Sequence, residues 1–405
     1  MMRLFKRKTM RRVTRLVMVL LIIEFLDEWV FGLREAAWPL IRHDLQLDYG
    51  QIGLLISLPT FLAHLIEPVL GVLGDTWKRR SLILGGGLVF ALCLVGIAMS
   101  TSFWPLLLVF ILINPASGTF VGLAQATLMD SAPERHEQNM ARWTFAGSVG
   151  ILAGTLTLAL CIVLGVSWRM PFALQAVCFL AVIAWGWRLT YPQLHTLDEE
   201  GERVGLWDGL RLALKTMRRF EVMRWLILLQ FCNLMLDVLL GYLALYLVDV
   251  AGVTAAQASL GVAIWAGVGL LGDFLLIFLL ERVKGLTYLR YSILLELILF
   301  PLFLIVPVFE IKLVILALLG FFNAGWYSIL QGQLYSTMKG QSGAVMAVST
   351  VTGLLGSFIP LLIGVLADQF GLGVAMWALM AGPIVLWIGL PRRAVAGTVI
   401  DEGVR

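Results

Sequence analysis

The sequence predicts an all-α polytopic membrane protein with twelve transmembrane helices in two pseudo-symmetric six-helix bundles. Three observations predict this class: the apolar content, the distribution of basic residues and an internal repeat. Of the 405 residues, 60% are hydrophobic and only 14% are charged, and the mean hydropathy is +0.91. Soluble domains carry roughly 25% charged residues, whereas this apolar content suffices for twelve helices of about 20 residues. A soluble fold is therefore excluded.

Apolar runs, broken by Gly, Pro and clusters of charge, define the twelve spans. They lie near residues 14–41, 50–74, 80–100, 103–130, 140–166, 169–190, 223–248, 255–280, 286–308, 312–337, 343–367 and 373–391. One long polar linker, residues 191–221, separates an N-terminal bundle at 1–190 from a C-terminal bundle at 222–405. The second part of the linker, LWDGLRLALKTMRRF, has the pattern of an amphipathic helix on an anionic inner leaflet.

The basic residues predict the orientation of the chain. The connections on one side hold only Arg42, Arg169 and Lys312, with Arg34 inside span one near that end, and the other 26 of the 30 Lys and Arg residues lie on the opposite side. The positive-inside rule then predicts a multi-pass protein of the cell (inner) membrane with cytoplasmic N- and C-termini. Because orientation explains the basic residues, we expect no nucleic-acid partner.

Polar residues inside the apolar text indicate that the two halves repeat at an offset of 206 residues. The matched pairs are Glu67 with Asp273, Asp75 with Glu281, Lys78 with Lys284, and Gln125 with Gln331. Four matches at one offset, each on corresponding spans, favour a duplicated six-helix unit.

The link after span two, GVLGDTWKRR at residues 71–80, resembles the signature loop of the major facilitator superfamily. Gly71, Asp75, Arg79 and Arg80 match its pattern, whereas Thr76 replaces a basic residue and Lys78 replaces a Gly. The corresponding stretch of the second half, residues 280–285, resembles a degenerate copy in which Glu281 stands for the Asp. With twelve spans and the repeat, the resemblance covers the whole chain.

The resemblance implies a secondary transporter in which two bundles rock around a central site. Asp75 with Arg79 and Arg80 is expected to latch the inner gate, and Glu281 and Asp273 are the second-half candidates for the same role. Span five carries GSVGILAG at residues 147–154, which resembles the Gly-rich motif of antiporters in this superfamily with Thr155 in place of the usual Pro. Close helix packing is the simpler interpretation of these glycines.

Span one holds the most informative polar residues. At 100° per residue its charged residues fall within an arc of roughly 120°; they are Glu24, Asp27, Glu28, Arg34 and Glu35. A charge at the bilayer centre costs about 2.5–3.5 kcal/mol, so this face must meet a cavity or a paired interface. Crowded carboxylates are expected to exchange protons, with Asp27 or Glu24 as the coupling site. Structural ion pairing is the alternative.

Other spans carry further polar candidates. In the superfamily that the loop resembles, spans one, four, seven and ten line the central cavity. The candidates are His64 and Glu67 in span two, Gln230, Asn233 and Asp237 in span seven, and Asn323 and Gln331 in span ten. His64 beside Glu67 would suit either a proton relay or a structural role. Glu296 in span nine does not fit this pattern.

The sequence carries no phosphate-binding loop, so an ion gradient is the expected energy source. We expect proton-coupled efflux by antiport of a cationic or neutral amphipathic organic compound, because an acidic cavity with one Arg disfavours multiply anionic solutes. Proton-coupled uptake of a nutrient is one alternative, and divalent-metal transport through the acids and His64 is another. Na⁺ is the alternative coupling ion. We expect a monomer in contact with membrane lipid, no cofactor and no enzymatic activity, since the four histidines have no catalytic spacing.

Overall fold

The computed structural model describes residues 2–76, 79–130, 136–189, 219–280, 282–337 and 352–391, and this part of the chain is helical with short connections. Of the predicted linker at 191–221, only its last residues fall within these ranges, so its amphipathic helix lies outside the described residues. The same holds for the first part of predicted span eleven.

The first half contains six spans. In order they are α1 (Met2–Leu45), α2 (Tyr49–Thr76), α3 (Arg79–Met99), the continuous α4 (Phe103–Ser117), η1 (Gly118–Gly122) and α5 (Leu123–Asp130), then α6 (His136–Val163) and α7 (Arg169–Trp187). The segment η1 is one turn of π-helix. Such turns occur mostly as single bulges inside α-helices and frequently at functional sites.

The second half follows the same order. Its elements are α9 (Phe220–Asn233), the π-helical η3 (Leu234–Val238), α10 (Leu239–Asp249), α11 (Ala255–Leu280), α12 (Gly285–Ile305), α13 (Phe309–Asn323), α14 (Trp326–Thr337), α16 (Ile359–Phe370), α17 (Leu372–Trp377), η4 (Ala378–Met380) and α18 (Ala381–Gly389). Helices α13 and α14 form one span that breaks at Gly325, whose φ is +72°. At the 206-residue offset, η1 corresponds to residues 324–328, so both halves interrupt the same span at the same place.

Eleven helices in the described ranges are long and apolar enough to cross a membrane. The one remaining predicted span, span one, is α1, a helix of 44 residues that carries the acidic face. Its inner surface is nevertheless apolar and fully packed, since Leu20, Leu33, Trp38 and Ile41 have no exposed surface. Many large apolar side chains on the outer helices are exposed, as expected of a surface that faces lipid. These observations confirm the predicted all-α membrane fold.

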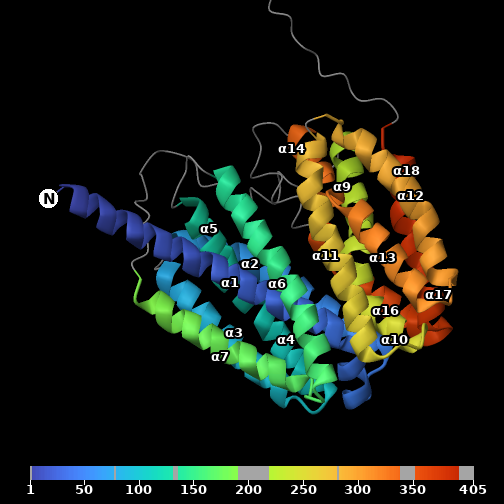
Figure 1. Cartoon of the computed structure of the whole chain (residues 1–405), viewed down its shortest axis with the longest axis horizontal. Helices are drawn as coiled ribbons and strands as arrows, with labels where there is room; N and C mark the ends of the chain where they lie inside the picture. Colours follow the sequence, from blue (N-terminus) through green and yellow to red (C-terminus); the bar gives the residue numbers. More distant parts are fainter. Residues whose placement is uncertain are drawn as a thin grey trace, which may run out of the picture.

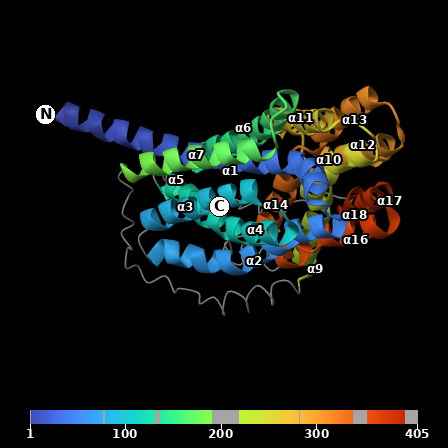
Figure 2. The same ribbon diagram turned by 90° about the horizontal axis from the view of Figure 1, so that it is seen from below.

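The two halves lie side by side, with α1–α7 in one group and α9–α18 in the other (Figures 1 and 2). Among the described residues, four helix pairs join them: α2 with α16, α6 with α11, and α1 with both α10 and α11. Gly53 of α2 lies directly against the backbone of Pro360 and Leu361 of α16, where a side chain would not fit. The ribbons meet near the ends of α1, α10 and α16 and diverge toward the ends of α5, α9 and α14 (Figure 1).

Candidate functional site

The acidic face of α1 contains a buried ion pair. Arg34 donates from Nε and Nη2 to Oε1 of Glu35 at 2.9 and 2.7 Å, and the Glu35 side chain is only 3% exposed. The second oxygen of Glu35 accepts a hydrogen bond from Trp38 Nε1 at 2.9 Å. The guanidinium also lies 5.0 Å from the centre of the Phe31 ring. A planar cation held by a carboxylate and an aromatic face has a fixed orientation.

Asp27 has a partner from another span. Its Oδ1 accepts a hydrogen bond from Ser117 Oγ at 2.8 Å, and Ser117 is the last residue of α4 before the π-helical turn η1. Asp27, Phe31 and Arg34 line a cavity of about 240 Å³ between α1, α2 and α4. Of the two carboxylates that the sequence favoured for coupling, Asp27 and Glu24, Asp27 is therefore the one that lines a space able to hold water or a solute.

Glu24 and Glu28 lie on the side of α1 that faces α6. A side chain at Gly147 would run into the Glu24 carboxylate, and one at Gly150 would run into the backbone of Phe25 and Trp29. The predicted Gly-rich motif thus serves close packing of α6 on α1. Glu24 remains within electrostatic range of Glu28 and Asp27, so the three acids form one cluster.

The second half supplies the opposite wall. Gln230, Asn233 and Asp237, from α9 and η3, line a cavity of about 330 Å³ together with Arg34 and Glu35. His64 of α2 also lines it. Asp237 lies within electrostatic range of Glu35 and Glu28. This cavity and the one beside Asp27 share Phe31, Arg34, Ile56 and Thr60 in their linings. They form adjoining parts of one acidic site between the halves.

The two halves are sealed together at one end of this site. Asp249 at the end of α10 accepts from Arg42 Nη1 at 3.0 Å and from the Tyr49 hydroxyl at 2.9 Å. Asp368 of α16 accepts from the backbone N–H groups of Tyr49 and Gly50 at 2.8 and 2.6 Å. A carboxylate at these free N–H groups stabilises the N-terminus of α2 and its dipole.

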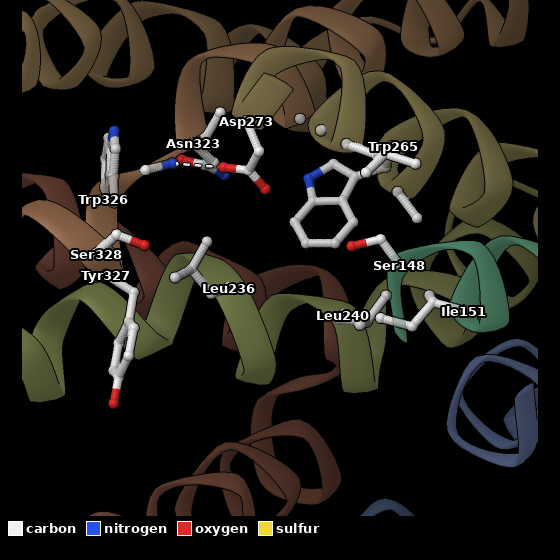
Figure 3. Close-up of a pocket in the computed structure, with 16 residues that line it drawn as sticks. Ser148, Ile151, Leu236, Leu240, Trp265, Asp273, Asn323, Trp326, Tyr327 and Ser328 are labelled. Carbon is white, nitrogen blue, oxygen red and sulfur yellow. Dashed lines mark hydrogen bonds between the residues drawn. The ribbon is translucent and has the colours of Figure 1, made fainter. Parts of the chain in front are cut away.

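A third cavity, of about 220 Å³, lies within the second half and against α6. Figure 3 shows the Asp273 carboxylate and the Trp265 indole ring pointing into it from α11, with Ser148 of α6 nearby. Asp273 accepts a hydrogen bond from the backbone N–H of Gly325 at 2.9 Å, at the break between α13 and α14. Asn323 lines the same cavity. The predicted gating residue Asp273 is therefore bound to its own half.

Several predicted residues lie elsewhere. The side chains of Glu67 and Asp75, and the whole of Glu281, lie outside the described residues. Arg80 donates to the backbone carbonyl of Trp187 in its own half. Gln331 is partly buried on α14 and is absent from the linings of the cavities described above. Within the described ranges, no three His, Cys, Asp or Glu side chains are grouped to hold a metal ion.

Sequence reasoning missed four residues that complete the site: Ser117, Tyr49, Asp249 and Asp368. Ser117 carried a usable signal, because a hydroxyl in span four stands on the face expected to line the cavity. The two acids stand at the ends of spans, where charged residues are ordinary.

The chain combines an acidic site between two halves with an interruption at the same place in the fourth span of each half. Residues 17–360 match the family model described as the Major Facilitator Superfamily. The chain belongs to this superfamily. A bacterial homolog of the human lysosomal transporter Spinster, in an inward-facing and unoccupied conformation, has a similar fold with a TM-score of 0.75 and 15% identity, covering 94% of this chain and 95% of that one.

The nucleoside transporter NupG also has a similar structure, with a TM-score of 0.74 and 15% identity, covering 93% of this chain and 98% of that one. An occupied inward-facing structure of the Spinster homolog gives a TM-score of 0.77 at 15% identity, covering 94% and 95%. No curated protein matches the sequence. The protein is thus a transporter of the major facilitator superfamily and a multi-pass membrane protein.

Proposed function

We propose that this transporter is a proton-coupled antiporter that exports a cationic or neutral amphipathic organic compound. The observation that carries the proposal is the acidic site beside Arg34, where five carboxylates of the described chain form one group, each within electrostatic range of at least one other. They are Glu24, Asp27, Glu28, Glu35 and Asp237. Glu35 is paired with Arg34, so the remaining acids offer binding positions for protons or for a positively charged solute.

Competition between these two ligands gives the direction of coupling. A cation and a proton that share the same carboxylates exclude one another, so binding of one favours release of the other. Exchange of this kind across a membrane is antiport, and an inward proton gradient then drives the compound outward. Phe31, Ile56 and Tyr242 in the lining provide apolar contact for an amphipathic molecule.

The transport cycle follows from the sealed end. With the predicted topology, Asp249 and Asp368 close the outer side and the acidic site is reached from the cytoplasm. Rocking of the halves would break the Asp368 hydrogen bonds to α2 and open the outer side. In that state Asp75, Arg79 and Arg80, with Glu281 in the second half, latch the inner gate. The protein then works as a monomer in the inner membrane with both termini in the cytoplasm.

Reconstitution into liposomes with an imposed pH gradient tests the proposed function. Solutes of each charge class are screened for flux that depends on the gradient, in wild-type protein and in protein-free liposomes. The proposal expects accumulation of a cationic or neutral compound on the acidic side of the membrane. Accumulation on the alkaline side would instead support proton-coupled uptake. Flux that depends on a sodium gradient and not on the pH gradient would identify Na⁺ as the coupling ion.

A further inference from the structure

Glu296 of α12 is a fully buried acid outside the acidic site. Its side chain has no exposed surface, and neither carboxylate oxygen has a hydrogen-bond partner. Among the ion pairs of the described residues, none includes Glu296. An ionised carboxylate without a cation or donors is very costly in a bilayer, whereas a neutral carboxylic acid costs far less.

The surroundings of Glu296 contain no compensating charge. Helices α17 and α18, which pack against α12, carry no charged residue, and α14 carries none either. The charged residues of α13 are Glu310 and Lys312, about 16 Å or more along the helix from Asn323. Lys312 already donates to the Tyr246 hydroxyl at 3.2 Å and to the Phe303 carbonyl. On its own helix Tyr288 lies within electrostatic range, with Asp273 beyond it, whereas Arg290 stands six residues away, about 9 Å along α12 and on a different side of the helix.

Asn323 connects Glu296 to the third cavity. Its side chain lies beside the Glu296 carboxyl, and its Nδ2 donates to the Met235 carbonyl at 3.3 Å. Its Oδ1 is buried without a partner. Asn323 also lines the cavity into which Asp273 points (Figure 3). A hydroxyl on Glu296 would bring a donor close to the unpartnered Oδ1 of Asn323.

We propose that Glu296 is a second proton-binding site, located in the C-terminal bundle, and that it exchanges its proton with the third cavity, from which the Asn323 side chain separates it. In the conformation described here the carboxyl holds the proton. Asn323 is the last residue of α13, and Ser292, one turn before Glu296, accepts a hydrogen bond from Trp326 Nε1 at 2.9 Å at the start of α14. Glu296 therefore stands close to both sides of the break at Gly325, beside Asn323 and one turn from the residue that Trp326 contacts.

This inference adds a site to the proposed proton coupling, but its test needs neither a gradient nor a transported solute. Infrared difference spectroscopy of the purified full chain detects the C=O stretch of a protonated buried carboxyl. We expect such a band in wild-type protein near neutral pH, a shift of the band in D₂O, and loss of the band at alkaline pH. The band is expected to disappear in Glu296→Gln and to persist, unchanged in position, in the control Asp27→Asn.

Glu296→Asp provides a second reading if the Gln variant does not fold, because it keeps the acid and moves the band. A wild-type spectrum that is unaltered by both substitutions would overturn the assignment. A Glu296 band that responds to neither D₂O nor alkaline pH would also overturn it, since the proton would then be locked in place. Either result would leave the proposed antiport at α1 unaffected. Conversely, a failure to detect antiport in liposomes would not remove the infrared band of Glu296.

Discussion

Helix α1 and its counterpart in the second half, α9 with η3 and α10, occupy equivalent places but carry different chemistry. At the 206-residue offset Glu24 corresponds to Gln230 and Asp27 to Asn233. In each pair the first half carries the acid and the second half carries the corresponding amide. An amide keeps the shape and hydrogen-bonding capacity of the acid but does not titrate. At these two positions we therefore expect α1 to bind protons and its second-half counterpart to position the solute.

The strongest test of this asymmetry is Asp27→Asn, which makes the first half resemble the second. We expect gradient-driven accumulation in proteoliposomes to fall to the background of empty liposomes, while gradient-independent exchange continues. Ser117→Ala is the matched control, because it removes only the hydrogen bond to Asp27, worth about 1 kcal/mol, and should lower accumulation about fivefold at most. Unchanged accumulation in Asp27→Asn would remove the coupling role from this residue and direct the same test to Glu24.

The Arg34–Glu35 pair tests how the first half tolerates its charges. Arg34→Gln leaves the buried Glu35 without its cation, and we expect the free energy of unfolding to fall by about 3 kcal/mol. Thermal unfolding in detergent measures this change. The double variant Arg34→Gln with Glu35→Gln should recover most of the loss, and equal melting temperatures for all three proteins would show that the pair contributes nothing.

The sealed end should respond to Asp368→Asn. This change weakens two charge-assisted hydrogen bonds to the N-terminus of α2, worth about 1–2 kcal/mol together, so the outward-open population should rise roughly five- to thirtyfold. Labelling of Thr60→Cys, in the cavity lining, with a reagent confined to the outer side measures the shift. Asp249→Asn, at the neighbouring contact, is the comparison. Labelling that stays at the wild-type rate would contradict the gate.

At the inner latch we expect a smaller difference between the halves, in the effects of substituting Asp75 and Glu281. Asp75→Asn should shift Thr60→Cys accessibility toward the cytoplasm by a fewfold, because a carboxylate beside Arg79 and Arg80 contributes about 1 kcal/mol or less. Glu281→Gln, in the degenerate copy of the motif, should have a weaker effect. A larger effect of Glu281→Gln would reverse the asymmetry for gating.

The smallest expected effect is that of Asn233→Ala. Loss of one hydrogen-bonding amide from the second-half wall should weaken apparent solute affinity about fivefold, near 1 kcal/mol, and leave the proton-to-solute ratio unchanged. Transport kinetics and stoichiometry in the same proteoliposomes separate the two quantities. A changed ratio would place part of the proton chemistry in the second half's wall.

Sequence predicted the spans and the acidic face well because charges are rare and expensive inside a membrane, so each one is informative. The placement of the five charged residues of α1 was less accessible. A shared arc of one helix still meets several neighbours, and here Glu24 and Glu28 face α6 while Asp27 faces Ser117. The contacts of Asp249 and Asp368 depend on which ends of the two halves meet, and no periodicity records this. The π-helical turns are likewise set by tertiary packing.

Proton release upon solute binding tests the central claim most directly. Purified protein in weakly buffered solution is mixed with a transported cation while a pH indicator reports the free proton concentration. Competition for the carboxylates predicts that wild-type protein releases about one proton per bound cation and that Asp27→Asn releases markedly fewer. Binding of the cation without proton release in wild-type protein would contradict the antiport account.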